Sequence, residues 1–367
     1  MTSDKRSGGG GVPPATPDWW VYHGDGRILR GDLDDVLMGP PPWRTFDGGP
    51  LQPRPPEDEA EITRRIGPRH GPSDARRPVN TDEADMVNAA LYLRRPLLVT
   101  GRPGTGKSSL AYRVARELGL ARVLRWPITS RSGVNSGIYQ YDGIARAQDA
   151  ATYRAEADAQ PDRNPPERTG GKTRIGDYVR LGPLGTALLP YRLPRILLID
   201  ELDKSDMDLP NDLLNAIEEG EYEIPELVRA AAREPEVTVL TDDPGGSAVV
   251  RNGRVRCRAF PLIVITSNGE REFPPAFLRR CLRLELAAPD IEELAAMVAT
   301  RFGVRDGARL DDIVRIFVAH SARQGGLPTD QLLNSVYLAT SDRFARDDHW
   351  DRLVTALWRS LDATGPG

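Results

Sequence analysis

The chain has 367 residues, enough for one large or two modest domains with a hydrophobic core. Its formal net charge is only −4, which gives no overall reason to expect nucleic acid or an anionic membrane as a partner. No apolar run reaches the ~20 residues of a membrane helix, and the basic start lacks the apolar stretch of a secretory signal. Two isolated cysteines and four histidines fit no disulfide framework or zinc motif, so we expect a cytoplasmic protein.

Residues 1–79 form an N-terminal arm that holds 13 prolines and 12 glycines, too many for a packed domain of its own. The arm nevertheless contains aromatic side chains, which are scarce in plain linkers: Trp19, Trp20, Tyr22, Trp43 and Phe46. Two interpretations stay open. The arm lies across the folded part of its own chain, or it is a docking segment for another protein.

The pattern becomes regular from residue 80. The stretch "NTDEADMVNAALYLRR" predicts a helix with Asn80 or Thr81 as its N-cap, because acidic residues follow in the first turn and basic residues stand in the last. Five apolar runs predict strands, at residues 97–100, 122–129, 195–200, 262–266 and 282–286. Several are continuous rather than alternating, which favours a parallel sheet covered by helices on both faces.

The remaining segments complete a three-part plan. Residues 145–176 are polar and end in Pro- and Gly-rich sequence, so we expect an exposed excursion between sheet elements. After the last predicted strand come four predicted helices, at residues 290–302, 310–323, 329–345 and 348–362. The sequence therefore predicts the arm (1–79), an α/β sheet domain (80–289) and a helical domain (290–367).

A glycine-rich loop follows the first predicted strand. "GRPGTGKS", from Gly101 to Ser108, fits G-x-x-x-x-G-K-[ST] between a strand and a helix, the context that this phosphate-binding motif requires. Side chains at Gly104 and Gly106 would block backbone N–H groups from phosphate oxygens and disfavour φ > 0. Lys107 would reach the β- and γ-phosphates, and Ser108 would ligate Mg²⁺. The candidate nucleotide-binding residues are Gly101, Arg102, Pro103, Gly104, Thr105, Gly106, Lys107, Ser108 and Ser109.

Two acidic residues end the third predicted strand, in "RILLIDELDKSD". Asp200 can hold Mg²⁺ through water, and Glu201 can orient and deprotonate the water that attacks the γ-phosphate. A simple nucleotide kinase needs no such glutamate, because its nucleophile comes from a second substrate. The pair therefore favours hydrolysis over phosphoryl transfer.

Polar residues also follow the fourth predicted strand. In "PLIVITSNGE", the amide of Asn268 can hydrogen-bond the attacking water or the γ-phosphate, although Asn before Gly is also a common turn. Just before the last strand, "FPPAFLRRCLRLEL" places Arg279 and Arg280 side by side. They are either solvated surface residues or a cation held toward the nucleotide of a neighbouring subunit.

Residues ~80–290 resemble the ATPase core of the AAA+ superfamily, and within it the MoxR-like group. The resemblance rests on "GRPGTGKSS" (Walker A), "ILLIDELDK" (Walker B), "ITSN" (sensor 1), "PPAFLRRC" (arginine-finger region) and the stretch from "LGPLGTALLP" to "LLNAIEEG". It implies a five-stranded parallel αβα P-loop domain with a helical lid, assembled as a ring, usually a hexamer, with ATP between subunits. It also implies insertions at 145–176 and 221–260.

Two departures from the family pattern matter. Where the lid of MoxR-like proteins commonly carries a sensor-2 arginine, this chain has Thr329 in "GGLPTDQLLN". The finger region reads Leu-Arg-Arg-Cys rather than Leu-Asp-Arg-Phe, so Arg280 is the better positional match and Arg279 the rival.

The expected function is that of a MoxR-like AAA+ ATPase that uses ATP and Mg²⁺ to remodel or activate a protein partner. By family analogy, a protein with a von Willebrand factor A domain is a reasonable partner. The alternative is a slow nucleotide-controlled switch in a bacterial stress or defence system, in which the ATP state gates recruitment through the aromatic arm. A DNA-translocating motor is less favoured, because basic residues are not in excess over acidic ones in the insertions taken together.

Overall fold

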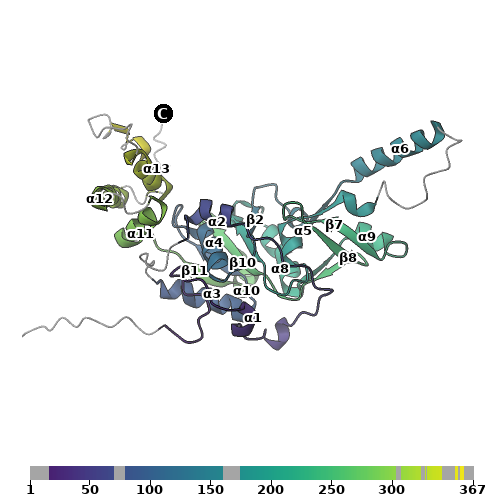
Figure 1. Cartoon of the computed structure of the whole chain (residues 1–367), viewed down its shortest axis with the longest axis horizontal. Helices are drawn as coiled ribbons and strands as arrows, with labels where there is room; N and C mark the ends of the chain where they lie inside the picture. The colour runs from purple at the N-terminus through teal and green to yellow at the C-terminus, as the bar shows by residue number, and fades with distance from the viewer. Residues whose placement is uncertain are drawn as a thin grey trace, which may run out of the picture.

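A five-stranded parallel sheet lies at the centre of the computed structural model (Figure 1), which describes residues 16–69, 79–159, 174–302, 307–323, 327, 329–340, 352–353 and 356–358. The strand order is β11-β1-β10-β5-β2, and every ladder is parallel. The strands are β1 (Leu97–Thr100), β2 (Leu124–Pro127), β5 (Ile196–Asp200), β10 (Leu262–Ser267) and β11 (Leu282–Glu285). They match the five strands predicted from apolar runs, so the predicted α/β sheet is confirmed.

Both faces of this sheet are buried, which explains the continuous apolar runs. Ile196 and Leu198 of β5 pack in the cluster that contains Val87 of α3 (Thr81–Leu93) and Leu110 of α4 (Lys107–Glu117). Leu197 belongs to a second cluster on the other face. That cluster includes apolar residues of α7 (Pro183–Ala187), α8 (Leu209–Glu219) and α10 (Pro275–Arg280).

A second sheet of six strands, which the sequence analysis did not predict, extends from the first, in the order β3-β4-β7-β8-β9-β6. Its strands are β3 (Tyr139–Tyr141), β4 (Val179–Leu181), β6 (Glu221–Glu223), β7 (Glu236–Leu240), β8 (Ser247–Arg251) and β9 (Arg254–Arg256). Four of them lie within the insertion expected at 221–260, and the other two flank the excursion at 145–176. Short helical segments accompany them: α5 (Val134–Ile138), α6 (Gly143–Ala159), η2 (Ile175–Tyr178) and α9 (Pro225–Ala230).

The described part of the N-terminal arm packs on the sheet domain. It contains α1 (Leu33–Val36), η1 (Pro42–Arg44) and α2 (Glu59–Ile66). Tyr22 is fully buried, and its backbone N–H and C=O both bond to the side-chain amide of Asn88 in α3. This packing agrees with the first interpretation of the arm. Trp19 and Trp43 stay 45% and 80% exposed, so two of the aromatic side chains face solvent.

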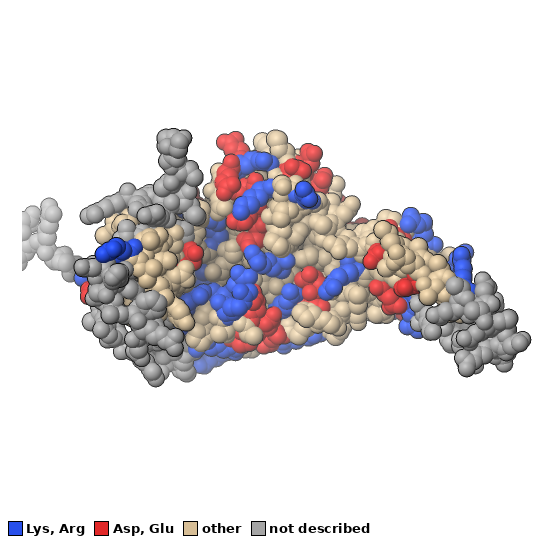
Figure 2. Space-filling view, turned by 90° about the horizontal axis from the view of Figure 1, so that it is seen from above, with Lys and Arg blue, Asp and Glu red and all other residues tan. Residues whose placement is uncertain are grey.

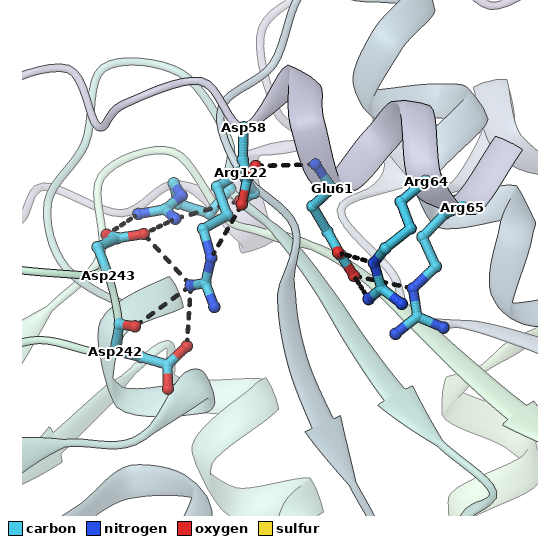
Figure 3. A network of polar contacts seen from close by, with 8 residues as sticks. Asp58, Glu61, Arg64, Arg65, Arg122, Asp242 and Asp243 are labelled. Carbon is cyan, nitrogen blue, oxygen red and sulfur yellow. Dashed lines mark hydrogen bonds and ion pairs between the residues drawn. The ribbon is translucent and has the colours of Figure 1, made fainter. Parts of the chain in front are cut away.

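A network of ion pairs connects the arm to both sheets (Figure 3). Asp58 caps α2 by accepting the N–H of Glu61 at 2.9 Å, and it lies 3.8 Å from Nε of Arg122, just before β2. Arg122 also pairs with Asp242 at 3.1 Å and with Asp243 at 3.6 Å, in the turn between β7 and β8. One arginine thus joins three parts of the chain.

Helices follow the last strand, as predicted. They are α11 (Ile291–Phe302), α12 (Gly307–Arg323) and α13 (Thr329–Ala339), and they share a third apolar cluster. This helical lid and the second sheet lie at opposite ends of the five-stranded sheet (Figure 1). The fourth predicted helix, 348–362, lies mostly outside the described residues. Among the residues that the structure describes, none of the helices has the length and apolar character needed to span a membrane.

Candidate nucleotide site

The glycine-rich loop connects β1 to α4 with backbone angles that favour glycine. Gly101, Gly104 and Gly106 have φ values of 152°, 81° and 85°. A Cβ built on Gly101 would lie 2.5 Å from the carbonyl oxygen of Leu286, so a side chain there would force the backbone apart. Positive φ at Gly104 and Gly106 is what the motif predicts, because the loop must turn its N–H groups inward.

Lys107 begins α4 and folds its ammonium group back over the loop. Its Nζ donates to the carbonyl oxygens of Gly101 at 2.8 Å and Arg102 at 2.9 Å. Burial lowers the pKa of Lys107, although the nearby carboxylates of Asp203 and Glu201 act in the opposite direction. Both of these carbonyl partners of Nζ are neutral, so the cation is available to phosphate oxygens placed in the loop.

Ser108 and Asp200 meet at the carboxyl end of the sheet, where the hydroxyl of Ser108 donates to Oδ1 of Asp200 at 2.6 Å. Thr266 donates to the same oxygen at 2.9 Å, and Arg125 donates to Oδ2 at 2.8 Å from Nη2 and 3.2 Å from Nε. Burial alone would raise the pKa of Asp200, but the hydrogen bonds from Ser108, Arg125 and Thr266 outweigh it and lower that pKa. Asp200 is therefore a fixed, ionised carboxylate at neutral pH.

Glu201 follows in a left-handed conformation, with φ of 61°, which is costly for a non-glycine residue. Its N–H donates to Oγ1 of Thr266 at 2.8 Å, and its carboxylate pairs with Lys204 at 2.7 Å. Asn268 directly follows the neighbouring strand β10, and its N–H donates to Oδ2 of Asp203 at 2.8 Å. This left-handed turn places Glu201 just beyond the end of β5, where it lines the nucleotide cavity.

These residues line one cavity of about 830 Å³, a size that suits a small ligand. The residues predicted from sequence that line it are Pro103, Gly104, Gly106, Lys107, Ser108, Ser109, Asp200, Glu201 and Asn268. Residues 24–30 of the arm and the lid residues Arg301 and Thr329 complete the wall. A larger cavity of about 970 Å³ lies between α8 and the second sheet, and it contains none of the predicted site residues.

The lid reaches the phosphate-binding loop through Thr329, which the sequence analysis placed where a sensor-2 arginine would be expected. Oγ1 of Thr329 donates to the carbonyl oxygen of Gly104 at 2.6 Å. Thr329 thus contacts the loop without supplying a positive charge. Arg301 of α11 lines the same cavity and donates to the carbonyl oxygen of Arg65 in α2.

The two candidate finger arginines do not line this cavity. Arg280 pairs with Glu218 of α8, and its side chain is 39% exposed. The carbonyl oxygen of Arg279 accepts a hydrogen bond from Arg95. The structure therefore keeps both residues away from the nucleotide cavity of their own chain, and a role in a neighbouring subunit remains a prediction.

Sequence reasoning missed three residues that shape the site: Arg125, Asp203 and Thr266. Asp203 is buried and holds the N–H groups of Asn268 and Glu270, so it fixes the loop after β10. It lies in the same "IDELDK" stretch as Asp200, which was the available signal. Arg125 and Thr266 act through contacts with residues 75 and 66 positions away, which no local pattern predicts.

The fold and the loop geometry define a P-loop nucleotide-binding domain. The family described as "AAA domain (dynein-related subfamily)" matches residues 96–281, slightly more than half of the chain, and the chain belongs to this family. It is thus a P-loop ATPase of the AAA+ superfamily, as the sequence predicted.

Among solved structures, the chain is similar to NtrX from Brucella abortus in complex with ADP. The sequence identity is 14% and the TM-score is 0.37, with 73% of this chain and 51% of that chain covered. The chain thus spans about half the length of that protein. No significant match was found among curated proteins.

Proposed function

We propose that the chain is a MoxR-like AAA+ ATPase that hydrolyses ATP with Mg²⁺ and uses the reaction to remodel or activate a protein partner. One observation carries the proposal: a single cavity collects Lys107, Ser108, Asp200, Glu201 and Asn268. The contact between Thr329 and Gly104 supports a lid that responds to the state of the phosphate-binding loop.

The donor set at Ser108 and Asp200 fits Mg²⁺, which prefers hydroxyl, carboxylate and water oxygens. The two side chains are 2.6 Å apart, and the hydroxyl oxygen of Ser108 keeps lone pairs when it donates its proton to Asp200. Ser108 and Asp200 would hold the ion, which would neutralise charge on the phosphate oxygens.

Each of the remaining site residues has its own role in ATP hydrolysis. Lys107 binds the β- and γ-phosphate oxygens, and Asn268 orients the attacking water. Glu201 accepts the proton of that water as the general base. In the structure the carboxylate of Glu201 pairs with the exposed side chain of Lys204. To act as the base, Glu201 would release Lys204 and accept a hydrogen bond from the attacking water when the nucleotide is bound.

A homo-oligomeric ring, usually a hexamer, and a partner with a von Willebrand factor A domain are proposed from the resemblance to MoxR-like proteins. The position of Arg280 outside the cavity of its own chain is compatible with a finger that serves a neighbour.

A slow nucleotide-controlled switch is the second candidate function. The observation in its favour is that residues 24–30 of the arm line the nucleotide cavity, while Trp19 and Trp43 of the same arm stay exposed.

A DNA motor is less supported, because basic and acidic residues are interspersed on the face shown in Figure 2. In the second sheet, Arg251, Arg254 and Arg256 each pair with an acidic residue.

Two substitutions test the proposal. Glu201→Gln should keep ATP binding but lower the hydrolysis rate by roughly 10²–10⁴-fold, because the amide is a far weaker base. Lys107→Ala should abolish ATP binding. Glu219→Gln is the control, since Glu219 is exposed and lies outside this cavity. Normal turnover in Glu201→Gln would contradict the hydrolytic role of Glu201.

ATP turnover measured with added partner protein or DNA separates an ATPase stimulated by its substrate from a slow switch.

A further inference from the structure

Arg125 holds the outer oxygen of the Asp200 carboxylate. The register of β2 on β5 places Pro127 opposite Asp200, so the side chain of Arg125 reaches Asp200 from two residues further back on the strand. Nη2 and Nε both donate to Oδ2, at 2.8 and 3.2 Å. With Ser108 and Thr266 on Oδ1, both carboxylate oxygens have partners.

Arg125 does not belong to the wall of the nucleotide cavity. Its side chain is 39% exposed, and within the described part of the chain its hydrogen bonds and ion pair go to Asp200. It is therefore placed to act on the nucleotide site only through this carboxylate. Asp200 does not need Arg125 in order to be ionised at neutral pH, because a carboxylic acid with an ordinary or lowered pKa has already lost its proton at that pH.

We infer that Arg125 competes with Mg²⁺ for Asp200 and thereby sets the Mg²⁺ concentration at which the chain binds its nucleotide. The inference rests on the proposed metal site at Ser108 and Asp200. Arg125 is a positioning residue, since it touches the carboxylate and not the nucleotide cavity.

Competition follows from charge and from the number of acceptor sites. A guanidinium group only donates hydrogen bonds, so it cannot ligate a cation, and its positive charge repels Mg²⁺ at the same carboxylate. Mg²⁺ or one of its water molecules needs an acceptor lone pair of Asp200, and Arg125 uses two N–H groups on Oδ2. Replacing Arg125 with a neutral residue should therefore strengthen Mg²⁺ binding.

The test is a Mg²⁺ titration of nucleotide binding by the full chain, with the β,γ-imido analogue of ATP as a ligand that is not turned over. Arg125→Gln should lower the Mg²⁺ concentration at half-maximal binding by about tenfold, as expected for removal of one nearby charge. Arg125→Lys keeps the charge and should shift this midpoint less. Arg283→Gln is the matched control, because Arg283 is an exposed arginine on β11, at the opposite edge of the same sheet.

The analogue's affinity in EDTA should be the same in all four proteins. An unchanged or higher Mg²⁺ midpoint in Arg125→Gln overturns the inference. So does a loss of affinity that is equal with and without Mg²⁺, which would indicate a merely structural role. Arg125→Met is a second neutral variant if the glutamine variant does not fold.

Lys107→Ala separates failure of this inference from failure of the proposed function. If Lys107→Ala binds the analogue as well as the unsubstituted chain does, the nucleotide site itself is wrongly assigned. If Lys107→Ala loses binding while Arg125→Gln keeps the original Mg²⁺ midpoint, the site stands and only the role of Arg125 fails.

Discussion

Glu117 fastens the arm to the helix that follows the phosphate-binding loop. Its carboxylate accepts the backbone N–H groups of His23, Gly24 and Gly26, and the last two bonds are 3.2 Å long. Burial, with a smaller contribution from Asp25, raises the pKa of Glu117 to about 7, although the three N–H groups favour the ionised form. Because residues 24–30 line the nucleotide cavity, this single carboxylate links arm and site.

This pKa predicts a pH dependence of stability. In the unfolded chain Glu117 titrates near its ordinary value of 4.5, so between pH 4.5 and 7 the folded state binds more protons than the unfolded state. The contribution of Glu117 to the free energy of unfolding should therefore rise as the pH falls through this window, by up to about 3 kcal/mol.

Glu117→Gln provides the comparison, since glutamine does not titrate. Denaturant unfolding of both proteins between pH 8 and pH 5 should show the original chain gaining stability relative to the variant as the pH falls. Parallel pH profiles would mean that the pKa of Glu117 in the folded chain is ordinary.

At the scale of single residues, the sequence predicted the parts of the site that lie in contiguous motifs. Lys107 and Ser108 belong to one loop, and Asp200 and Glu201 end one apolar run, so chain order alone brings each pair together. Glu117 gave no signal, because a glutamate at the end of an amphipathic helix normally faces solvent. Its partners lie 91 to 94 residues earlier in the chain, and only the packed arm buries it.

At the scale of elements, the central sheet was predictable and the second sheet was missed. The five strands of the first are short apolar runs, buried on both faces. In the second, β7 ("EVTVL") and β8 ("SAVVR") alternate between exposed and buried residues, a pattern that indicates a half-buried strand. This alternating pattern was therefore present in the sequence, over five residues in each of the two strands. The pairing of β4 with β7 joins segments far apart in the sequence, so it had no local signal.

The junction between the two sheets depends on a buried ion pair, from which we predict the effect of a substitution on stability. Asp243, in the turn after β7, accepts two hydrogen bonds of 2.8 Å from Arg195, which directly precedes β5. Both side chains are nearly fully buried. Asp243→Asn leaves the buried guanidinium without its counter-charge, which typically costs about 3–5 kcal/mol.

The matched control is Glu236→Gln, which removes an exposed ion pair with Arg251 in the same sheet. Exposed pairs contribute about 1 kcal/mol or less. Denaturant unfolding should therefore show a much larger loss of stability for Asp243→Asn. Equal losses in the two variants would mean that this junction does not hold the sheets together.

At the scale of the whole molecule, the arrangement of the site raises the question of where Arg280 acts. The cavity of a single chain is lined by part of the phosphate-binding loop, by Asp200 at the end of β5 and by Glu201 directly after it, but by neither Arg279 nor Arg280. Arg280 instead lies beside Glu218 at the end of α8, and the arm contacts the same turn through Arg44, which donates to the carbonyl oxygens of Ile217 and Glu218. A finger at this position needs a neighbouring subunit.

Mixing two inactive variants tests action across a subunit interface. Arg280→Ala should hydrolyse ATP poorly with little loss of ATP affinity, because the finger stabilises charge on a neighbour's nucleotide. Lys107→Ala cannot bind ATP but still presents Arg280. In mixed rings an intact Arg280 meets an intact phosphate-binding loop, so part of the activity should return, as measured by phosphate release against the mixing ratio. Arg283→Ala mixed with Lys107→Ala is the control for the effect of mixing alone. If mixed oligomers form and no activity returns, Arg280 does not act in trans, and the same experiment with Arg279→Ala decides whether its neighbour does.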